Sequence, residues 1–149
     1  MASASKSPRA RTGPIRGPVP AVSPERRSLR YTYVIELRPA VWASTRFRDE
    51  NPRATARVKK GEVVAAVYVG SSAHRGSCRF DIHRGSTTCS CSLTRTGAVK
   101  AGTGSTWVRE YGVRLLWDVE VRGDDADART AETELAVRLR AQGYGVWQR

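Results

Sequence analysis

The chain has 149 residues, the length of one compact domain, so a large enzyme with separate cofactor and substrate lobes is not expected. Hydrophobic residues make up 40% of the chain and charged residues 27%, which excludes a wholly disordered protein. The 26 lysines and arginines outnumber the 14 acidic residues and give a formal net charge of +12, which favours a polyanionic partner such as nucleic acid.

The first 30 residues differ in composition from the rest of the chain. They contain five of the seven prolines, and seven lysines and arginines against one glutamate, so half of the net charge lies there. We expect a disordered basic arm at 1–30 and one folded domain at 31–149. The arm is a solvated linker, an artefact of an upstream start codon, or a segment that binds phosphates without sequence preference.

The first half of the folded domain shows two strand patterns. Residues 31–37 alternate between apolar and polar side chains, which predicts a strand. Residues 44–61 are polar and strongly basic, and we expect a long loop there, with room for one helical turn. Residues 62–70 are apolar on both faces, so a second strand inside the sheet is predicted.

Two short helices are expected before the last strand. Ser77 is a candidate N-cap for a helix that ends at His83. The segment 85–106 is rich in Gly, Ser and Thr and predicts an irregular loop. A helical turn at 106–111 is stopped by Gly112.

The C-terminal part predicts one strand and one helix. Strict alternation over 113–122 indicates a half-buried third strand. A helix over 126–142 follows, with Gly143 just past its end. Its predicted core stripe consists of Ala128, Ala131, Leu135 and Leu139. Together these elements predict an α+β fold.

No apolar run is long enough to cross a bilayer, and the N-terminus lacks the apolar segment of a secretory signal. We therefore expect a cytoplasmic protein without a membrane partner. The three cysteines are an odd number in a chain of this size, so a disulfide framework is not expected.

Two glutamates on the predicted C-terminal helix differ in their surroundings. Glu132 shares a helix face with Leu135 and Leu139, so its carboxylate points toward the sheet, where an unpaired charge is costly. A bound metal ion would explain this placement. Glu134 lies on the opposite side with Arg138 four residues on, the spacing of a solvated ion pair. Glu132 is therefore favoured as a metal ligand.

Three short motifs occur in a fixed order along the chain. They are Tyr31-Thr32-Tyr33, Tyr68-Val69-Gly70 and Arg79-Phe80-Asp81-Ile82-His83, and Glu132 follows on the late helix. With them the chain, over about residues 31–148, resembles the GIY-YIG nuclease superfamily, in particular its small stand-alone bacterial proteins. The resemblance implies a small three-stranded antiparallel sheet flanked by helices. It also implies metal-dependent endonuclease activity on DNA.

The resemblance also implies roles for particular residues. Tyr33 would be the general base or the phenol that positions water, and Tyr68 would orient the water or the phosphate. Arg79 would hold the scissile phosphate, because a guanidinium stays charged and presents a planar fork of donors. His83 would bind a phosphate or assist the tyrosines. Glu132 would ligate one Mg²⁺ or Mn²⁺ ion.

Basic residues outside these motifs are candidates for binding the nucleic-acid backbone. They are Arg46, Arg48, Arg53, Arg57, Lys59, Lys60 and Lys100. No phosphate-binding or dinucleotide-binding glycine motif is present, so no small-molecule cofactor is expected.

Other interpretations stay open at this point. Each singled-out residue also has a plain structural explanation, as a strand tyrosine, a solvated arginine or a surface histidine. The main alternative function is a non-catalytic nucleic-acid-binding protein on the same fold, and a module that binds an acidic protein is a third. A zinc site is a weaker alternative because its ligands lack the usual knuckle spacing; they would be Cys78, His83, Cys89 and Cys91.

Overall fold

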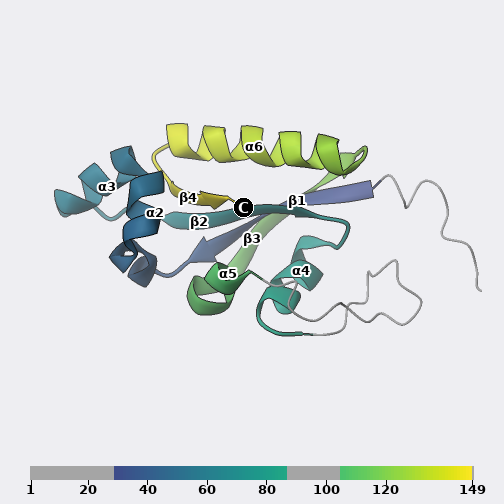
Figure 1. Ribbon diagram of the computed structural model, residues 1–149, viewed down its shortest axis with the longest axis horizontal. Coiled ribbons are helices and arrows are strands. Elements are labelled where there is room, and N and C mark those ends of the chain that lie inside the picture. Colours follow the sequence, from purple (N-terminus) through teal and green to yellow (C-terminus); the bar gives the residue numbers. More distant parts are fainter. Residues whose placement is uncertain (1–28, 87–104, 149) are drawn as a thin grey trace, which may run out of the picture.

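The computed structural model describes residues 29–86 and 105–148, which form an α+β fold on one four-stranded mixed sheet (Figure 1). The strand order is β3-β1-β2-β4, with β1 antiparallel to β2 and β3 and with β2 parallel to β4. The strands are β1 Leu29–Leu37, β2 Ala66–Ser72, β3 Gly112–Arg122 and β4 Gly145–Gln148. Most of the predicted arm and of the loop at 85–106 falls outside the described residues, as do Lys100, Cys89 and Cys91.

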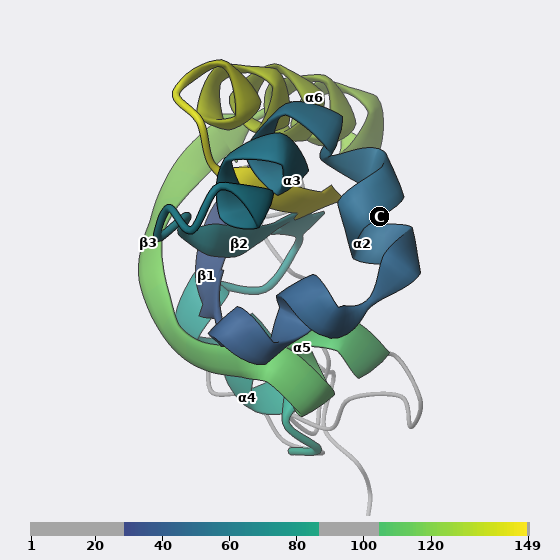
Figure 2. The same cartoon turned by 90° about the vertical axis from the view of Figure 1, so that its left-hand side faces the viewer.

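Helices cover both faces of this sheet (Figures 1 and 2). Alternation along β1 sends Val34 toward α6 (Asp125–Ala141) and Tyr33 toward the opposite face. That opposite face carries α4 (Gly76–His83) and α5 (Thr106–Tyr111). The helix predicted at 126–142 is confirmed as α6, and its first turn is closed by a reciprocal capping box between Asp124 and Asp127.

The prediction of a three-stranded antiparallel sheet was wrong, because β4 adds a fourth, parallel strand. Val146 in this strand is fully buried, and the side chain of Asn51 holds its backbone. Asn51 Oδ1 accepts the Val146 N–H at 2.7 Å, and its Nδ2 donates to the Val146 carbonyl at 3.1 Å and to the Phe47 carbonyl at 2.8 Å. A strand of four residues is too short to show a period in the sequence.

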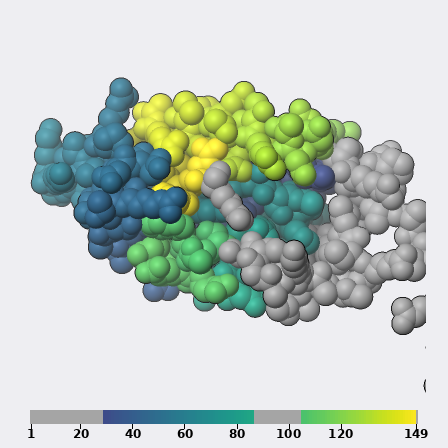
Figure 3. Space-filling view, viewed as in Figure 1, coloured from purple at the N-terminus to yellow at the C-terminus, as the bar shows by residue number. Residues whose placement is uncertain are grey.

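The predicted basic loop at 44–61 was also wrong. It forms α2 (Thr45–Glu50) and α3 (Pro52–Lys59) after a short 3₁₀ helix, η1 (Pro39–Ala43). The start signals were present, since Ser44 accepts the Phe47 N–H and Pro52 occupies the first turn of α3. These helices form one end of the molecule, and α6 runs along its upper side (Figure 3).

Two strands differ from their predicted bounds or burial. β2 begins at Ala66 rather than at residue 62, and Val63 is 98% exposed, but β2 is an interior strand as predicted. β3 was predicted to be half-buried, yet Trp117 and Val119 are 39% and 52% exposed. β3 is an edge strand with two register shifts against β1, and α6 lies mainly over β2 and β4.

Helix α4 begins one residue before the predicted N-cap, and Ser77 does not cap it. Arg75 is the N-cap and makes no side-chain capping bond. Instead, Asp118 on β3 accepts the Gly76 N–H at 2.8 Å. The turn at 106–111 is confirmed as α5, with Gly112 at its end. None of the helices in the described ranges is long and apolar enough to span a membrane.

Candidate active site

A cleft lies where β4 stops running beside β2. The described pairs between these strands end at Val69 and Gln148, so Gly70 and Ser71 lie just beyond the covered edge. A cavity of about 560 Å³ opens there. Its described lining consists of Tyr33, Tyr68, Gly70, Ser71, Arg79, Arg129, Glu132, Thr133 and Gln148.

Four of the five residues in the predicted catalytic and metal set therefore line one cleft. Tyr33 and Tyr68 come from the sheet face that carries α4, whereas Glu132 comes from α6 on the other face. They meet because β4 ends beside the cleft, so side chains from both faces of the sheet can reach it. The fifth residue, His83, is fully buried behind Tyr33.

The two tyrosine rings lie nearly parallel with centroids 6.2 Å apart, and both side chains are almost completely buried. Gly70 is what allows this arrangement. A Cβ at position 70 would lie 2.6 Å from the Tyr33 hydroxyl oxygen and 2.8 Å from Tyr68 Cε1. The glycine of the second sequence motif thus leaves the space in which the Tyr33 hydroxyl sits.

His83 contacts both tyrosine rings and bonds to one of them. Its Nε2 lies 3.0 Å from the Tyr33 hydroxyl, and its Nδ1 accepts the backbone N–H of Ser105 at 2.6 Å. An imidazole nitrogen that accepts a backbone N–H carries no proton, so the neutral ring holds its proton on Nε2. His83 is therefore the donor to the Tyr33 oxygen.

The electrostatic surroundings of Tyr33 favour its protonated form. Burial raises the pKa of the Tyr33 phenol well above its ordinary value, and neighbouring Tyr68 adds to the rise. The Arg79 guanidinium opposes this rise. Tyr33 therefore faces the cleft as a neutral hydroxyl. A neutral hydroxyl is better suited to positioning a water molecule than to removing a proton from that water.

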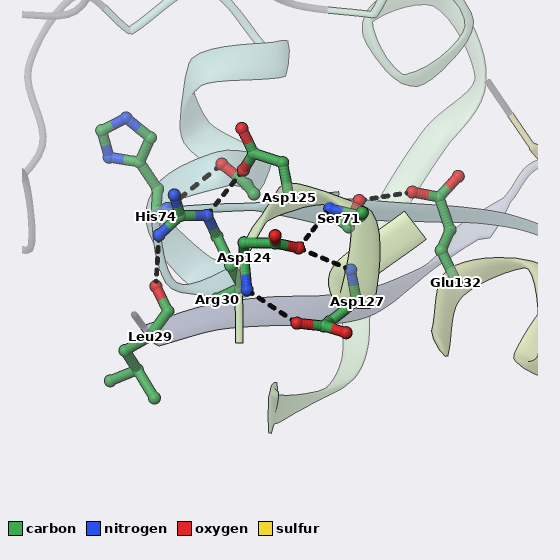
Figure 4. Close-up of polar contacts among 10 residues, drawn as sticks. Leu29, Arg30, Ser71, His74, Asp124, Asp125, Asp127 and Glu132 are labelled. Atoms are coloured by element: carbon green, nitrogen blue, oxygen red, sulfur yellow. Dashed lines mark hydrogen bonds and ion pairs between the residues drawn. The ribbon is translucent and has the colours of Figure 1, made fainter. Parts of the chain in front are cut away.

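Glu132 is the one carboxylate in the described lining, and it is only 6% exposed. Ser71 Oγ donates to its Oε2 at 2.6 Å, as Figure 4 shows. Burial raises the pKa of the Glu132 carboxyl, while the hydrogen bonds from Ser71 and Gln148 and the charge of Arg129 lower it. Glu134 is exposed as predicted, but it is not ion-paired with Arg138.

The surroundings of Glu132 fit a single hard cation. The carboxylate makes no ion pair with a described residue, and a buried charge of this kind is costly without a compensating cation. The described residues contain no group of three or more metal-ligating side chains. One carboxylate with substrate oxygens and waters is a usual environment for Mg²⁺, so Glu132 would be its protein ligand.

The predicted backbone-binding arginines have several structural partners. Arg46 lies over the Trp147 ring, 4.9 Å from its centroid, and Trp147 precedes the cleft residue Gln148 in β4. Arg48 donates to the carbonyls of η1, and Arg57 pairs with Glu62 at 2.6 Å. The remaining described members, Arg53, Lys59 and Lys60, are exposed on α3 or at its end, at the end of the molecule remote from α4 (Figure 1).

A second cavity of about 340 Å³ lies between α3 and the end of α6, with Asn51, Val137 and Tyr144 in its lining. The side chain of Asn51 is fully engaged in the internal bonds described above. We assign no chemistry to it. Of the alternative zinc ligands, Cys78 is partly buried, and His83 is already bonded at both ring nitrogens.

Sequence reasoning missed five residues of the site: Ser71, Ser105 and Gln148, and also Arg129 and Thr133 on α6. Arg129 and Glu132 are three residues apart on one helix, so their common face was a detectable signal. Of the other three, Gln148 lies on β4, Ser71 lies near the end of β2, and Ser105 acts through its backbone amide. None of these positions leaves a pattern of side chains in the sequence. Comparisons with protein-family models, curated proteins and solved structures found no match.

Proposed function

We propose that this protein is a metal-dependent endonuclease that hydrolyses phosphodiester bonds in DNA. The observation that carries the proposal is the shared cleft of Tyr33, Tyr68, Arg79 and Glu132. It combines a phosphate-binding cation, hydroxyl groups that can hold water and a buried carboxylate without an ion-pair partner. These are the parts that metal-assisted hydrolysis of a phosphodiester requires.

In this proposal Arg79 holds the scissile phosphate with paired donors from its guanidinium group. Tyr33 and Tyr68 hold the attacking water on the sheet side of the cleft. His83 donates to the Tyr33 oxygen and so holds the phenol in place at the cleft. The water oxygen bonds to phosphorus and the bond from phosphorus to the leaving oxygen breaks, while the water gives up one proton to solvent and the leaving oxygen takes one from solvent.

Glu132 would hold a divalent cation on the α6 side of the cleft. A bound Mg²⁺ or Mn²⁺ would offset the phosphate charge and stabilise the leaving oxygen. Because burial raises the pKa of the Glu132 carboxyl, cation binding must displace a proton at acidic pH. Metal affinity should therefore increase as the pH rises through this pKa.

The proposal is tested with branched, flapped and plain duplex DNA in the presence of Mg²⁺ or Mn²⁺. Arg79→Ala and Glu132→Gln should abolish cutting, whereas Glu134→Gln, on the same helix but exposed, should leave it unchanged. A wild type that binds these DNAs but cuts none would support the alternative, a non-catalytic nucleic-acid-binding protein. Cutting that survives both cleft substitutions would reject the assignment of the site.

A further inference from the structure

We propose that Arg129 forms a second phosphate subsite beside Glu132, so that the substrate is a nucleic-acid strand with at least two adjacent phosphates. This inference rests on the proposed function, because it assumes that the scissile phosphate lies at Arg79. It names a binding residue and narrows the class of substrate. A small isolated phosphodiester would occupy the cleft without reaching Arg129.

The geometry of α6 places Arg129 on the cleft face. Arg129, Glu132 and Thr133 stand at positions i, i+3 and i+4, so their side chains share one side of the helix, and all three line the cleft. Three residues along a helix correspond to about 4.5 Å of rise. Arg129 therefore lies about one turn from the Glu132 carboxylate. Its long side chain can reach a phosphate that neighbours the scissile phosphate.

Arg129 makes no ion pair with a described residue, and its charge acts on the nearby Glu132 carboxyl. Asp125, four residues earlier on α6, is the expected ion-pair partner, but it pairs with Arg30 of β1 at 2.7 Å (Figure 4). Arg129 itself is exposed and is not ion-paired with a described residue. Its guanidinium is therefore available to a ligand.

The positions of the two cleft arginines, rather than the sum of the cleft charges, support an occupant with more than one phosphate. The described lining holds two arginines and one carboxylate. Arg79 enters from α4 and Arg129 from α6, so the positive charges come from opposite sides of the sheet. A single diester carries one negative charge, whereas a strand presents a regular row of phosphates. Two cations on opposite walls fit a strand that passes through the cleft.

The inference is tested first by binding, which does not require cutting. A fluorescent oligonucleotide is titrated in Ca²⁺, at several salt concentrations, with the wild type and three variants: Arg129→Gln, Arg129→Lys and Arg138→Gln. Arg138→Gln is the control, because Arg138 is an exposed arginine of α6 that does not line the cleft. Arg129→Gln should weaken binding roughly tenfold or more. It should also reduce the slope of log affinity against log salt by about 0.7 to 0.9, the loss of one phosphate contact. Arg129→Lys should retain most of the slope.

A second assay separates phosphate binding from an indirect effect on Glu132. Cleavage of an oligonucleotide is compared with hydrolysis of bis(p-nitrophenyl) phosphate, a diester with one phosphate. At saturating metal, Arg129→Gln should raise KM for the oligonucleotide by a larger factor than it lowers kcat/KM for the small diester. Equal losses on both substrates, or a salt slope equal to that of Arg138→Gln, would overturn the inference. Absence of cutting by the wild type would instead reject the proposed function, while the binding result would still decide the role of Arg129.

Discussion

Replacement of Gly70 by alanine tests whether the close approach of the two tyrosines forms the site. The new Cβ would lie 2.6 Å from the Tyr33 hydroxyl oxygen and 2.8 Å from both Tyr33 Cζ and Tyr68 Cε1. Ordinary contact begins at 3.4 Å, so the Tyr33 hydroxyl must move by about 0.8 Å. Both rings are almost completely buried and contact His83, so they have little room to move except toward the cleft.

Two costs follow from this displacement. Overpacking a buried site destabilises a protein by about 1 to 3 kcal/mol. Movement of the Tyr33 hydroxyl also breaks its 3.0 Å bond with His83, which adds about 1 kcal/mol. We expect Gly70→Ala to lose about 2 to 4 kcal/mol of unfolding free energy. Cleavage should fall about 100-fold, because a displacement near 1 Å disturbs alignment of the attacking water.

The assay is a double-mutant cycle with Tyr33→Phe, measured by urea unfolding. Removing the hydroxyl relieves the shortest contact, so the double variant should be less destabilised than the sum of the two single variants. The contact at Cζ stays, so the relief is partial. Purely additive losses, or full activity of Gly70→Ala, would refute the argument that position 70 must be glycine to seat the Tyr33 hydroxyl.

Three other substitutions test separate parts of the structure. Glu132→Gln should abolish cutting yet stabilise the fold at neutral pH. Burial raises the pKa of Glu132 in the folded state above its pKa in the unfolded chain. The wild type therefore loses stability as the pH rises from the unfolded-state pKa through the folded-state pKa, whereas the glutamine variant does not. Urea unfolding at a series of pH values would show this difference. Asn51→Ala should lose about 2 to 4 kcal/mol, because it leaves the buried Val146 amide unpaired, and Asn51→Asp should lose at least as much, because its carboxylate would face the carbonyls of Val146 and Phe47, which chemical denaturation would measure. His83→Ala should destabilise by at least about 2 kcal/mol and lower kcat more than it raises KM, in contrast to a residue that only binds substrate.

The sequence was informative where one element determines the position of a side chain. The period of 2 in β1 placed Tyr33 on one face, and the period of 3.6 in α6 turned Glu132 toward the sheet. Burial of Glu132 needs only the helix face and a neighbouring sheet, both of which the pattern supplies. The expectation that Glu132 is enclosed and Glu134 exposed is therefore confirmed by the structure.

The sequence was less informative where two distant segments must meet. The Ser105 amide that fixes the proton of His83 is 22 residues away, and the Ser71 hydroxyl on Glu132 is 61 residues away. Neither bond has a local pattern. The segment 44–61 was predicted as a loop because its charges obscured Phe47, Ala54 and Thr55, which are buried under short helices. Local charge composition gave the wrong structure there because tertiary packing decides it.

The shortest strand, which the sequence did not reveal, sets the boundary of the candidate site. β4 covers β2 as far as Val69, and Gln148 at its end forms part of the cleft wall. The side chain of Asn51 fixes β4 through hydrogen bonds to both the N–H and the carbonyl of Val146. A residue at the junction of α2 and α3 therefore controls how β4 lies against β2. Loosening that junction should therefore affect the cleft as well as the core. It would release the part of the cleft wall that Gln148 forms, without touching any group proposed to contact the substrate.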